Sequence, residues 1–276
     1  MAVPSRIAAV FESLRSRGQM AFMPFVTAGD PDLSTTVELI RLLRDCGVDL
    51  IEVGFPYSDP IADGPVIQAS YTRALANKVR LPDIFGALKA LSGESIPPLL
   101  AMVAYAIVFR TGPERFVLAA RQAGFSGLIV PDLPGDQAGA LFDLSRSHAL
   151  DLISLVAPTT TTQRVDRILQ SSSGFIYCLS VAGTTGVREM LPEELAQQLG
   201  QLRTKTKLPL AVGFGIGRPE QIDSLRGLAD GVIVGSALVR QIGRLNGPSA
   251  APRAQILEEV ATFARAMAEA AHKRNG

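Results

Sequence analysis

The sequence predicts a (β/α)8 barrel that forms a single domain over residues 1–276, and three observations support this fold class. Eight short apolar segments alternate along the chain with longer segments of helical spacing. The length of 276 residues suits one such barrel, because α/β barrels commonly reach this size as a single domain. No Gly-x-Gly-x-x-Gly motif follows an early strand, which disfavours the open doubly wound sheet as the alternative.

The eight apolar segments are predicted to be the strands. Near-continuous hydrophobicity with β-branched residues is typical of strands covered on both faces, as in a parallel sheet. The segments are AFMPFVT (21–27), VDLIEVGF (48–55), LLAMVAY (99–105), GLIVPD (127–132), DLISLVAP (151–158), FIYCLSV (175–181), LPLAVGFG (208–215) and GVIVGSAL (231–238).

Helices are predicted between the strands, before the first strand and after the last strand. In PDLSTTVELIRLLRDCG, the apolar residues Val37, Ile40 and Leu43 recur at helical spacing. Asp30 is expected to cap the start of this helix and Gly47 to end it. The same spacing predicts an extra helix before the first strand and another after the last strand.

Composition excludes several classes of protein. A formal net charge of +1 gives no reason to expect a nucleic-acid or membrane partner. Charged residues interrupt the N-terminal segment, so no signal peptide is expected. The longest uncharged apolar run, residues 96–109, is shorter than the roughly 20 residues of a membrane-spanning helix. Both cysteines lie in apolar segments typical of buried free thiols, and we expect a cytoplasmic protein.

The stretch IEVGFPYSDPIADGP carries the first candidate catalytic residue, Glu52. Strand alternation places Glu52 on the face opposite to Ile51 and Val53. Because this apolar pair suits the helix-covered outside, Glu52 is expected to point into the barrel near its C-terminal end, where barrel enzymes hold catalytic residues. Desolvation there would raise its pKa and suit proton transfer. The alternative is a structural ion pair with a cation at a neighbouring strand end, although those ends contain few lysines or arginines.

Two further acids, Asp59 and Asp63, follow in the same stretch. Each occurs in ordinary turn chemistry, Ser-Asp-Pro and Ala-Asp-Gly, so each alone is more often structural than catalytic. The connection after the second strand is unusually long, and long connections on a barrel lie at the catalytic face. Asp63 is therefore a catalytic candidate if this connection returns over the mouth that holds Glu52.

Glycines close the last two strands and indicate a phosphate site. Gly215 in VGFGIG, together with Gly235 and Ser236 in VGSAL, can offer backbone N–H groups and a hydroxyl to an anion. The alternative is that these glycines are turn residues only. The segment VAGTTGVREM (181–190) suits either a mobile loop over a ligand or a plain surface loop. Tyr177 is predicted to be a core or pocket-wall aromatic, with a direct chemical role as the alternative.

No cluster of Cys, His and acidic residues has the spacing of metal ligands, so no metal is expected. The residues alone predict a barrel enzyme that acts on a small phosphorylated substrate through carboxylate acid–base chemistry, without metal or cofactor.

Six motifs give the chain a family resemblance. PFVTAGDPD, IEVGFPYSDPIADGPVIQ, APTTT, GTTG, GFGI and VGSA occur in the order and spacing of the tryptophan synthase alpha chain family. The chain resembles this family over nearly its whole length. The resemblance implies a lyase of tryptophan biosynthesis that cleaves indole-3-glycerol phosphate to indole and glyceraldehyde 3-phosphate by a retro-aldol reaction.

The resemblance also implies roles for individual residues. Glu52 matches the family's general acid–base, Asp63 matches the carboxylate that accepts the indole N–H, and Tyr177 matches an active-site tyrosine. Thr185 matches a loop threonine that closes toward Asp63. The phosphate donors would be Gly186, Gly215, Gly235 and Ser236. The indole pocket would be lined by Phe25, Ile67, Met102, Ile129 and Phe214.

The resemblance further implies a partner, because the alpha chain pairs with a beta chain that carries PLP, in an α2β2 heterotetramer. No cofactor is expected in this chain itself. Pro56 and Asp59 match the loop that meets the partner. The sequence departs from the family after the third strand, where Ala104, Ala106 and Ile107 stand in place of the common Tyr-Asn-Pro pattern.

The alternatives are a stand-alone indole-3-glycerol phosphate lyase and a regulatory subunit that mainly activates a beta chain. A phosphosugar isomerase on the same barrel fits the motifs least.

Overall fold

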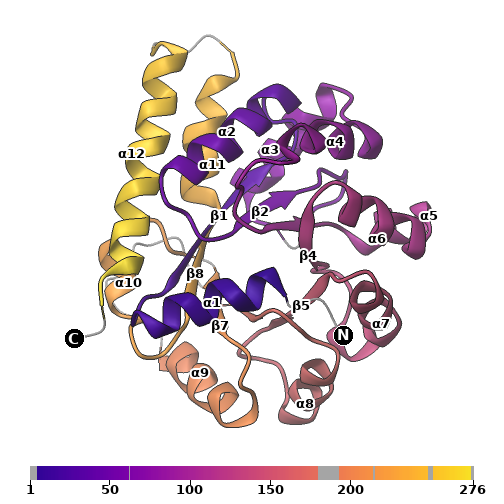
Figure 1. Cartoon of the computed structure of the whole chain (residues 1–276), viewed down its shortest axis with the longest axis vertical. Coiled ribbons are helices and arrows are strands. Elements are labelled where there is room, and N and C mark those ends of the chain that lie inside the picture. Colours follow the sequence, from indigo (N-terminus) through magenta and orange to yellow (C-terminus); the bar gives the residue numbers. More distant parts are fainter. Residues whose placement is uncertain (1–4, 62, 180–192, 214, 248–250, 275–276) are drawn as a thin grey trace.

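Eight parallel strands close into a ring in the computed structural model of the chain (Figure 1). The structure describes residues 5–61, 63–179, 193–213, 215–247 and 251–274. The strands are β1 (Ala21–Thr27), β2 (Ile51–Gly54), β3 (Leu99–Met102), β4 (Phe125–Ile129), β5 (Asp151–Val156), β6 (Ile176–Leu179), β7 (Leu210–Gly213) and β8 (Gly231–Val234). Each pairs with the next along the chain, and β8 pairs with β1. The predicted barrel is confirmed.

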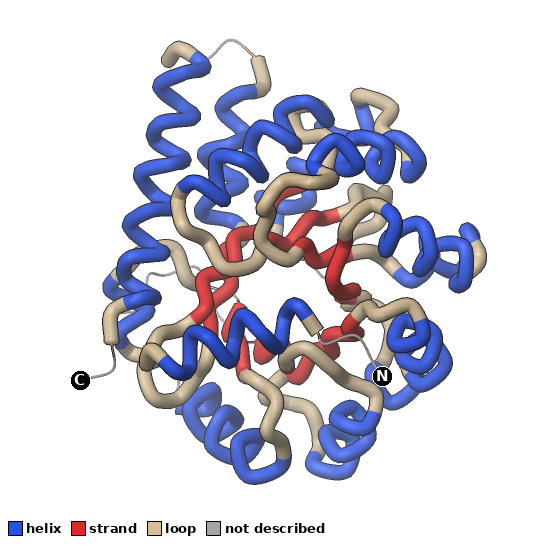
Figure 2. Tube along the Cα trace, in the orientation of Figure 1, coloured by secondary structure: helices blue, strands red, loops and turns tan. Residues whose placement is uncertain are grey.

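Helices surround this ring on the outside, as Figure 2 shows. The α-helices are α1 (Arg6–Ser16), α2 (Leu33–Asp45), α3 (Pro65–Ala76), α4 (Leu81–Leu88), α5 (Tyr105–Thr111), α6 (Pro113–Gln122), α7 (Gly139–Ser147), α8 (Thr162–Gln170), α9 (Glu193–Lys205), α10 (Glu220–Asp223), α11 (Ser236–Ile242) and α12 (Arg253–His272). Short 3-10 turns are η1 (Lys89–Leu91), η2 (Gly135–Gln137) and η3 (Gly243–Leu245). The extra helices before the first strand and after the last strand are confirmed as α1 and α12.

The start of α2 differs from the prediction. The N-cap is Asp32, whose carboxylate accepts a hydrogen bond from the Thr35 backbone N–H at 2.7 Å. Asp30 does not cap the helix. It is buried two residues earlier, where the guanidinium of Arg73 in α3 binds its carboxylate. The expected cap was therefore wrong, because a partner distant in sequence takes up the Asp30 carboxylate.

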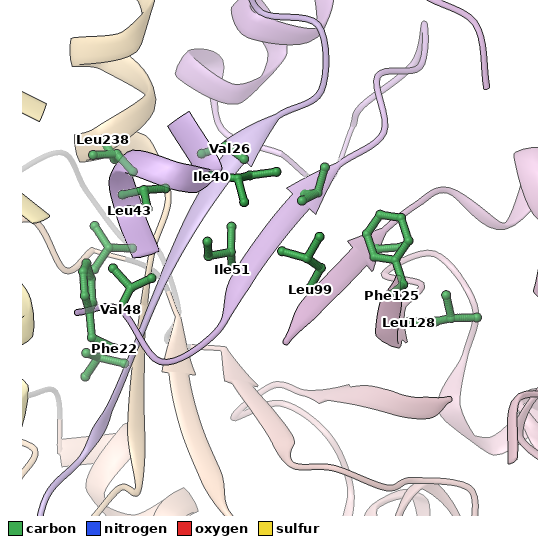
Figure 3. Packing of buried hydrophobic residues seen from close by; sticks show 14 of the residues in the cluster. Phe22, Val26, Ile40, Leu43, Val48, Ile51, Leu99, Phe125, Leu128 and Leu238 are labelled. Atoms are coloured by element: carbon green, nitrogen blue, oxygen red, sulfur yellow. The ribbon is translucent and has the colours of Figure 1, made fainter. Parts of the chain in front are cut away.

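Strand alternation sorts the apolar side chains into an outer and an inner cluster. The outer cluster lies between strands and helices, and Figure 3 shows part of it around Phe22, Ile51 and Leu99. The inner cluster fills the barrel and includes Leu50 and Leu100. The predicted orientation of β2 is confirmed, because Ile51 faces the helices while its neighbour Leu50 faces the barrel interior.

Helix α1 closes the N-terminal end of the barrel. Its buried residues Ile7, Phe11 and Leu14 belong to the inner cluster, and Figure 1 shows α1 lying across the ring of strands. The Phe11 and Phe175 rings pack at a centroid distance of 5.7 Å. Because this end is filled with apolar side chains, the space for a ligand lies at the opposite end, where the strands finish.

Candidate active site

A cavity of about 280 Å³ lies at the C-terminal ends of the strands. It is lined by residues of β1, β2, β3, β6 and β8, of the connections after β2, β7 and β8, and of helices α3 and α11. Most of the described residues predicted for the site line this cavity. They are Phe25, Glu52, Asp63, Ile67, Met102, Tyr177, Gly215, Gly235 and Ser236.

Glu52 is the buried carboxylate of this cavity. Its position in β2 pairs with Phe25 of β1 on one side and Leu100 of β3 on the other. Only 1% of its surface is exposed, and its Oε1 atom has no hydrogen-bond partner. Burial raises the pKa of Glu52 to about 8. No described Lys or Arg forms a salt bridge with it, so the structural ion pair considered from the sequence is not found there.

Asp63 reaches the same cavity from the connection between β2 and α3. Its backbone N–H donates to the Pro60 carbonyl at 3.1 Å, and its own carbonyl accepts from Gln68 Nε2 at 2.8 Å. Burial raises the pKa of the half-buried Asp63 carboxyl, and a hydrogen bond from Tyr57 lowers it. The long connection therefore returns over the barrel mouth and places a second carboxylate opposite the strand that carries Glu52.

Aromatic rings form the cavity wall where two glycines leave room for them. A Cβ atom on Gly213 would lie 2.4 Å from the Tyr177 ring, and one on Gly54 would lie 2.3 Å from the Phe25 ring. Both positions therefore require glycine if the rings are to keep these places. Burial, followed by the nearby carboxylates, raises the pKa of Tyr177 well above its usual range. Its hydroxyl is thus a neutral donor or acceptor at working pH.

The other end of the cavity is built from the loops after β7 and β8. Helix α11 begins at Ser236, with Gly235 as the N-cap and no side chain capping its first N–H groups. Such groups are free to bind an anion. In the neighbouring loop, the Gly217 N–H donates instead to Gln221 Oε1 at 2.8 Å. The start of α11 and the Ser236 hydroxyl therefore offer hydrogen-bond donors to a ligand at this end.

Sequence reasoning missed one charged residue of the cavity, Arg240. It lies one helical turn after Ser236, and helical side chains lean toward the N-terminus of their helix. Its guanidinium forms no ion pair with any carboxylate in the described part of the chain. The spacing of four residues from Ser236 is the signal that predicts its place. The other unpredicted lining residues are small or apolar, namely Gly64, Ile216, Gly217, Ile233 and Ala237.

Several predicted site residues are not tested by this geometry. Ile129 is fully buried in the inner cluster and does not line the cavity. Pro56 is buried and Asp59 is exposed in the β2–α3 connection. Gly186, Thr185 and Phe214, together with the segment 181–190, lie outside the described residues.

The described residues contain no group of three or more His, Cys, Asp or Glu residues arranged to hold a metal ion. None of the helices within the described ranges is long and apolar enough to span a membrane.

The cavity therefore has three chemically different parts. Phe25, Ile67 and Met102 offer apolar surface, Glu52 and Asp63 offer two carboxylates, and the start of α11 offers anion donors. Two carboxylates in unlike environments can divide the roles of proton donor and charge acceptor between them.

Comparison with known proteins gives one family. Residues 11–272 match the family model described as "Tryptophan synthase alpha chain". The chain is 44% identical to the tryptophan synthase alpha chain of Rhodopirellula baltica, over 95% of this chain and 96% of that one. It is also 44% identical to the one of Gloeobacter violaceus, over 98% and 96% of the two chains.

Solved structures agree. Tryptophan synthase subunit alpha from Legionella pneumophila superposes with a TM-score of 0.87 at 32% identity, covering 97% of this chain and 98% of that one. A chain of tryptophan synthase from Mycobacterium tuberculosis gives a TM-score of 0.87 at 33% identity, covering 99% and 100%. These matches do not favour the stand-alone lyase or the purely regulatory subunit. The chain belongs to the tryptophan synthase alpha chain family, a family of lyases in tryptophan biosynthesis.

Proposed function

We propose that this chain cleaves indole-3-glycerol phosphate to indole and glyceraldehyde 3-phosphate in a retro-aldol reaction. The observation that carries the proposal is the buried Glu52, which has no hydrogen-bond donor at Oε1 and shares its cavity with Asp63. A carboxyl with a pKa of about 8 holds its proton at neutral pH yet can exchange it with a substrate. The family relation supplies the substrate.

The substrate fits the three parts of the cavity. Phe25, Ile67 and Met102 would hold the indole ring, and the first N–H groups of α11 with the Ser236 hydroxyl would bind the phosphate. Between these ends lie the atoms that react, next to Glu52 and Asp63. The neutral Tyr177 hydroxyl lies in the same region and would help to orient the substrate.

The proton transfers can be assigned to these groups. Neutral Glu52 gives its proton to C3 of indole, and the positive charge that develops on the ring is stabilised by the Asp63 carboxylate, which accepts the indole N–H. The Glu52 carboxylate then takes the proton of the glycerol hydroxyl next to C3. The bond between C3 and the glycerol carbon that carries this hydroxyl then breaks. Its electrons return to the indole ring, and indole and glyceraldehyde 3-phosphate are released.

We also infer that the chain works with a beta chain, which carries PLP, in an α2β2 assembly in the cytoplasm. Two large apolar side chains lie exposed after β2 and β3: Ile61, at 90%, in the connection between β2 and α3, and Phe109, at 68%, in helix α5. The exposed Asp59 lies two residues before Ile61 in the same connection. Large exposed apolar side chains are typical of interaction surfaces when several of them lie together. Phe109 belongs to the same helix, α5, as Ala106 and Ile107, which depart from the family pattern.

The experiment is the release of indole from indole-3-glycerol phosphate by the purified chain, with and without a beta chain. The expected result is cleavage of this substrate, faster with the partner, and much weaker cleavage of indole glycerol without phosphate. A folded chain that releases no indole under either condition would refute the proposed reaction. Equal use of both substrates would refute the phosphate site.

A further inference from the structure

The two carboxylates of the cavity differ in the hydrogen-bond donors that reach them. The Tyr57 hydroxyl lies 3.4 Å from Asp63 Oδ2 and donates to it. Glu52 receives no such bond, because its Oε1 atom is buried without a partner. Glu52 is more deeply buried than the half-buried Asp63, and the Tyr57 hydroxyl adds to this difference because its hydrogen bond lowers the pKa of Asp63.

Both partners of this hydrogen bond are held in place by other contacts. The Tyr57 ring packs on the Tyr71 ring at a centroid distance of 5.5 Å and an interplanar angle of 50°. Tyr71 is fully buried in α3, so it provides a fixed support. Asp63 is held by its own backbone through Pro60 and Gln68. The hydroxyl and the carboxylate therefore meet because these contacts anchor both residues within the connection between β2 and α3.

Other titratable groups surround this pair, and in the described part of the chain none of them forms a hydrogen bond with the Asp63 carboxylate. They are Glu52 in β2, Tyr71 in α3, Asp132 after β4, Tyr177 in β6 and Arg240 in α11. Burial and nearby carboxylates raise the pKa of Tyr57 above its usual range, so its hydroxyl keeps the proton that it donates.

We propose that Tyr57 is a positioning residue of the reaction, whose hydroxyl holds Asp63 toward the substrate and keeps Asp63, rather than Glu52, as the ionised carboxylate. The proposal rests on the proposed function, which needs a charged acceptor at the indole nitrogen and a neutral donor at C3. A hydrogen bond to the charged form of an acid favours that form. Without Tyr57, burial would push both acids toward the protonated state, and the division of roles would weaken.

The test is Tyr57→Phe, which removes the hydroxyl and keeps the ring on Tyr71. Indole release should fall about 3- to 10-fold at neutral pH, as expected for one long hydrogen bond to a charged group. The acid limb of the kcat profile should move to higher pH, because Asp63 then protonates more readily. The loss should shrink above this limb, where Asp63 is ionised in both proteins, and KM should change little.

Tyr105→Phe is the matched control. It makes the same chemical change after a neighbouring strand, where the Tyr105 ring packs on Phe109 at 6.2 Å and its hydroxyl makes no hydrogen bond with the described residues. This variant should keep the wild-type pH profile. A Tyr57→Phe profile that superimposes on that of the wild type, or a loss that is equal at every pH, would overturn the proposal while leaving the proposed reaction intact.

A direct titration separates this proposal from the proposed function. Carbon NMR of labelled aspartate carboxyls gives the Asp63 pKa without any turnover, after assignment by Asp63→Asn. In Tyr57→Phe the pKa of Asp63 must rise relative to the wild type. If it does not, the proposal fails, even in a protein that cleaves the substrate. If the pKa rises but the wild type releases no indole, the reaction is wrong and the hydrogen bond to Asp63 still holds.

Discussion

Asp30 and Glu52 are both carboxylates with 1% of their surface exposed; Asp30 follows β1 by three residues, and Glu52 lies within the adjacent strand β2. Their surroundings differ completely. Asp30 accepts two hydrogen bonds from Arg73, at 2.9 and 2.7 Å, and one from Asn246 at 2.8 Å. Glu52 has an oxygen that accepts none. Burial alone therefore does not identify a catalytic acid, whereas burial without hydrogen-bond partners does point to one.

The hydrogen-bonded Asp30 stabilises the structure around Glu52. Arg73 belongs to α3, which follows Asp63, and Asn246 follows α11, which begins at the anion end of the cavity. By joining both helices to the end of β1, Asp30 fixes the parts of the fold that place cavity residues around Glu52. Leaving Glu52 without a partner at Oε1 is unfavourable. The hydrogen bonds of Asp30 stabilise the part of the fold that surrounds Glu52 and so help to offset this.

The largest expected effect comes from Glu52→Gln. Indole release should fall by about 10²- to 10⁴-fold, because the amide cannot give or take the proton. At pH 5 the free energy of unfolding should stay within about 1 kcal/mol of the wild type, because the amide then replaces a carboxyl that is neutral in the folded chain and no hydrogen bond is lost. Turnover and urea unfolding measure the two quantities.

Asp30→Asn is the matched control for that variant, since it makes the same change in the bonded acid. It should lower stability more than Glu52→Gln and turnover far less. Near-normal turnover in Glu52→Gln would remove Glu52 from the mechanism, and a similar outcome in both variants would break the contrast between the two acids.

The second effect is a pH dependence of the free energy of unfolding, which the raised pKa of Glu52 causes. Its pKa is about 8 in the folded chain against 4.5 as the reference value, which the unfolded chain approaches. The folded state therefore binds more protons between these values, and its stability falls as the pH rises through this window. The total change should be on the order of a few kcal/mol. Urea unfolding from pH 5 to 8.5 should show a steeper decline in the wild type than in Glu52→Gln, and parallel curves would contradict the raised pKa.

The third effect tests the bonded acid through Arg73→Ala. Removing the guanidinium leaves the buried Asp30 carboxylate without its ion pair and should lower the free energy of unfolding by about 2–3 kcal/mol. The control is Arg80→Ala, which breaks an exposed pair with Asp83 and should have little effect. If both variants unfold at the same urea concentration, Asp30 does not support the frame as described.

Sequence reasoning succeeded where the pattern is local. The alternation of Leu50, Ile51 and Glu52 decides which face each residue takes, so the inward orientation of Glu52 could be predicted. It failed for Asp30, because the choice between a helix cap and a buried ion pair depends on Arg73, 43 residues further along the chain. The pocket position of Ile129 was implied by the family resemblance alone and stays a prediction, because alternation gives the face of a strand residue but not its depth along the barrel.

Tyr57 was missed for a related reason. Its hydroxyl matters only because α3 places Tyr71 under its ring and because the connection turns back to bring Asp63 beside it. Both conditions depend on packing rather than on spacing in the sequence. The five residues between Tyr57 and Asp63 carry no periodic pattern from which such a contact could be predicted.

The smallest expected effect concerns two arginines that repeat the contrast between the acids. Arg73 uses its guanidinium on Asp30, whereas Arg240 lines the cavity and has no carboxylate partner among the described residues. An unpaired cation one turn above the start of α11 is placed to attract the substrate phosphate. Arg240→Gln should raise KM about 3- to 10-fold with little change in kcat, and added salt should reduce the difference because the guanidinium is exposed.

Arg244→Gln is the control for this charge, because Arg244 lies one turn further along, pairs with Glu259 and does not line the cavity. Its KM should match that of the wild type. Binding of indole glycerol without phosphate should be the same in all three proteins. If Arg240→Gln weakens this neutral ligand as much as the phosphorylated one, the arginine shapes the cavity instead of attracting the phosphate. The contrast between paired and unpaired charges would then apply to the acids alone.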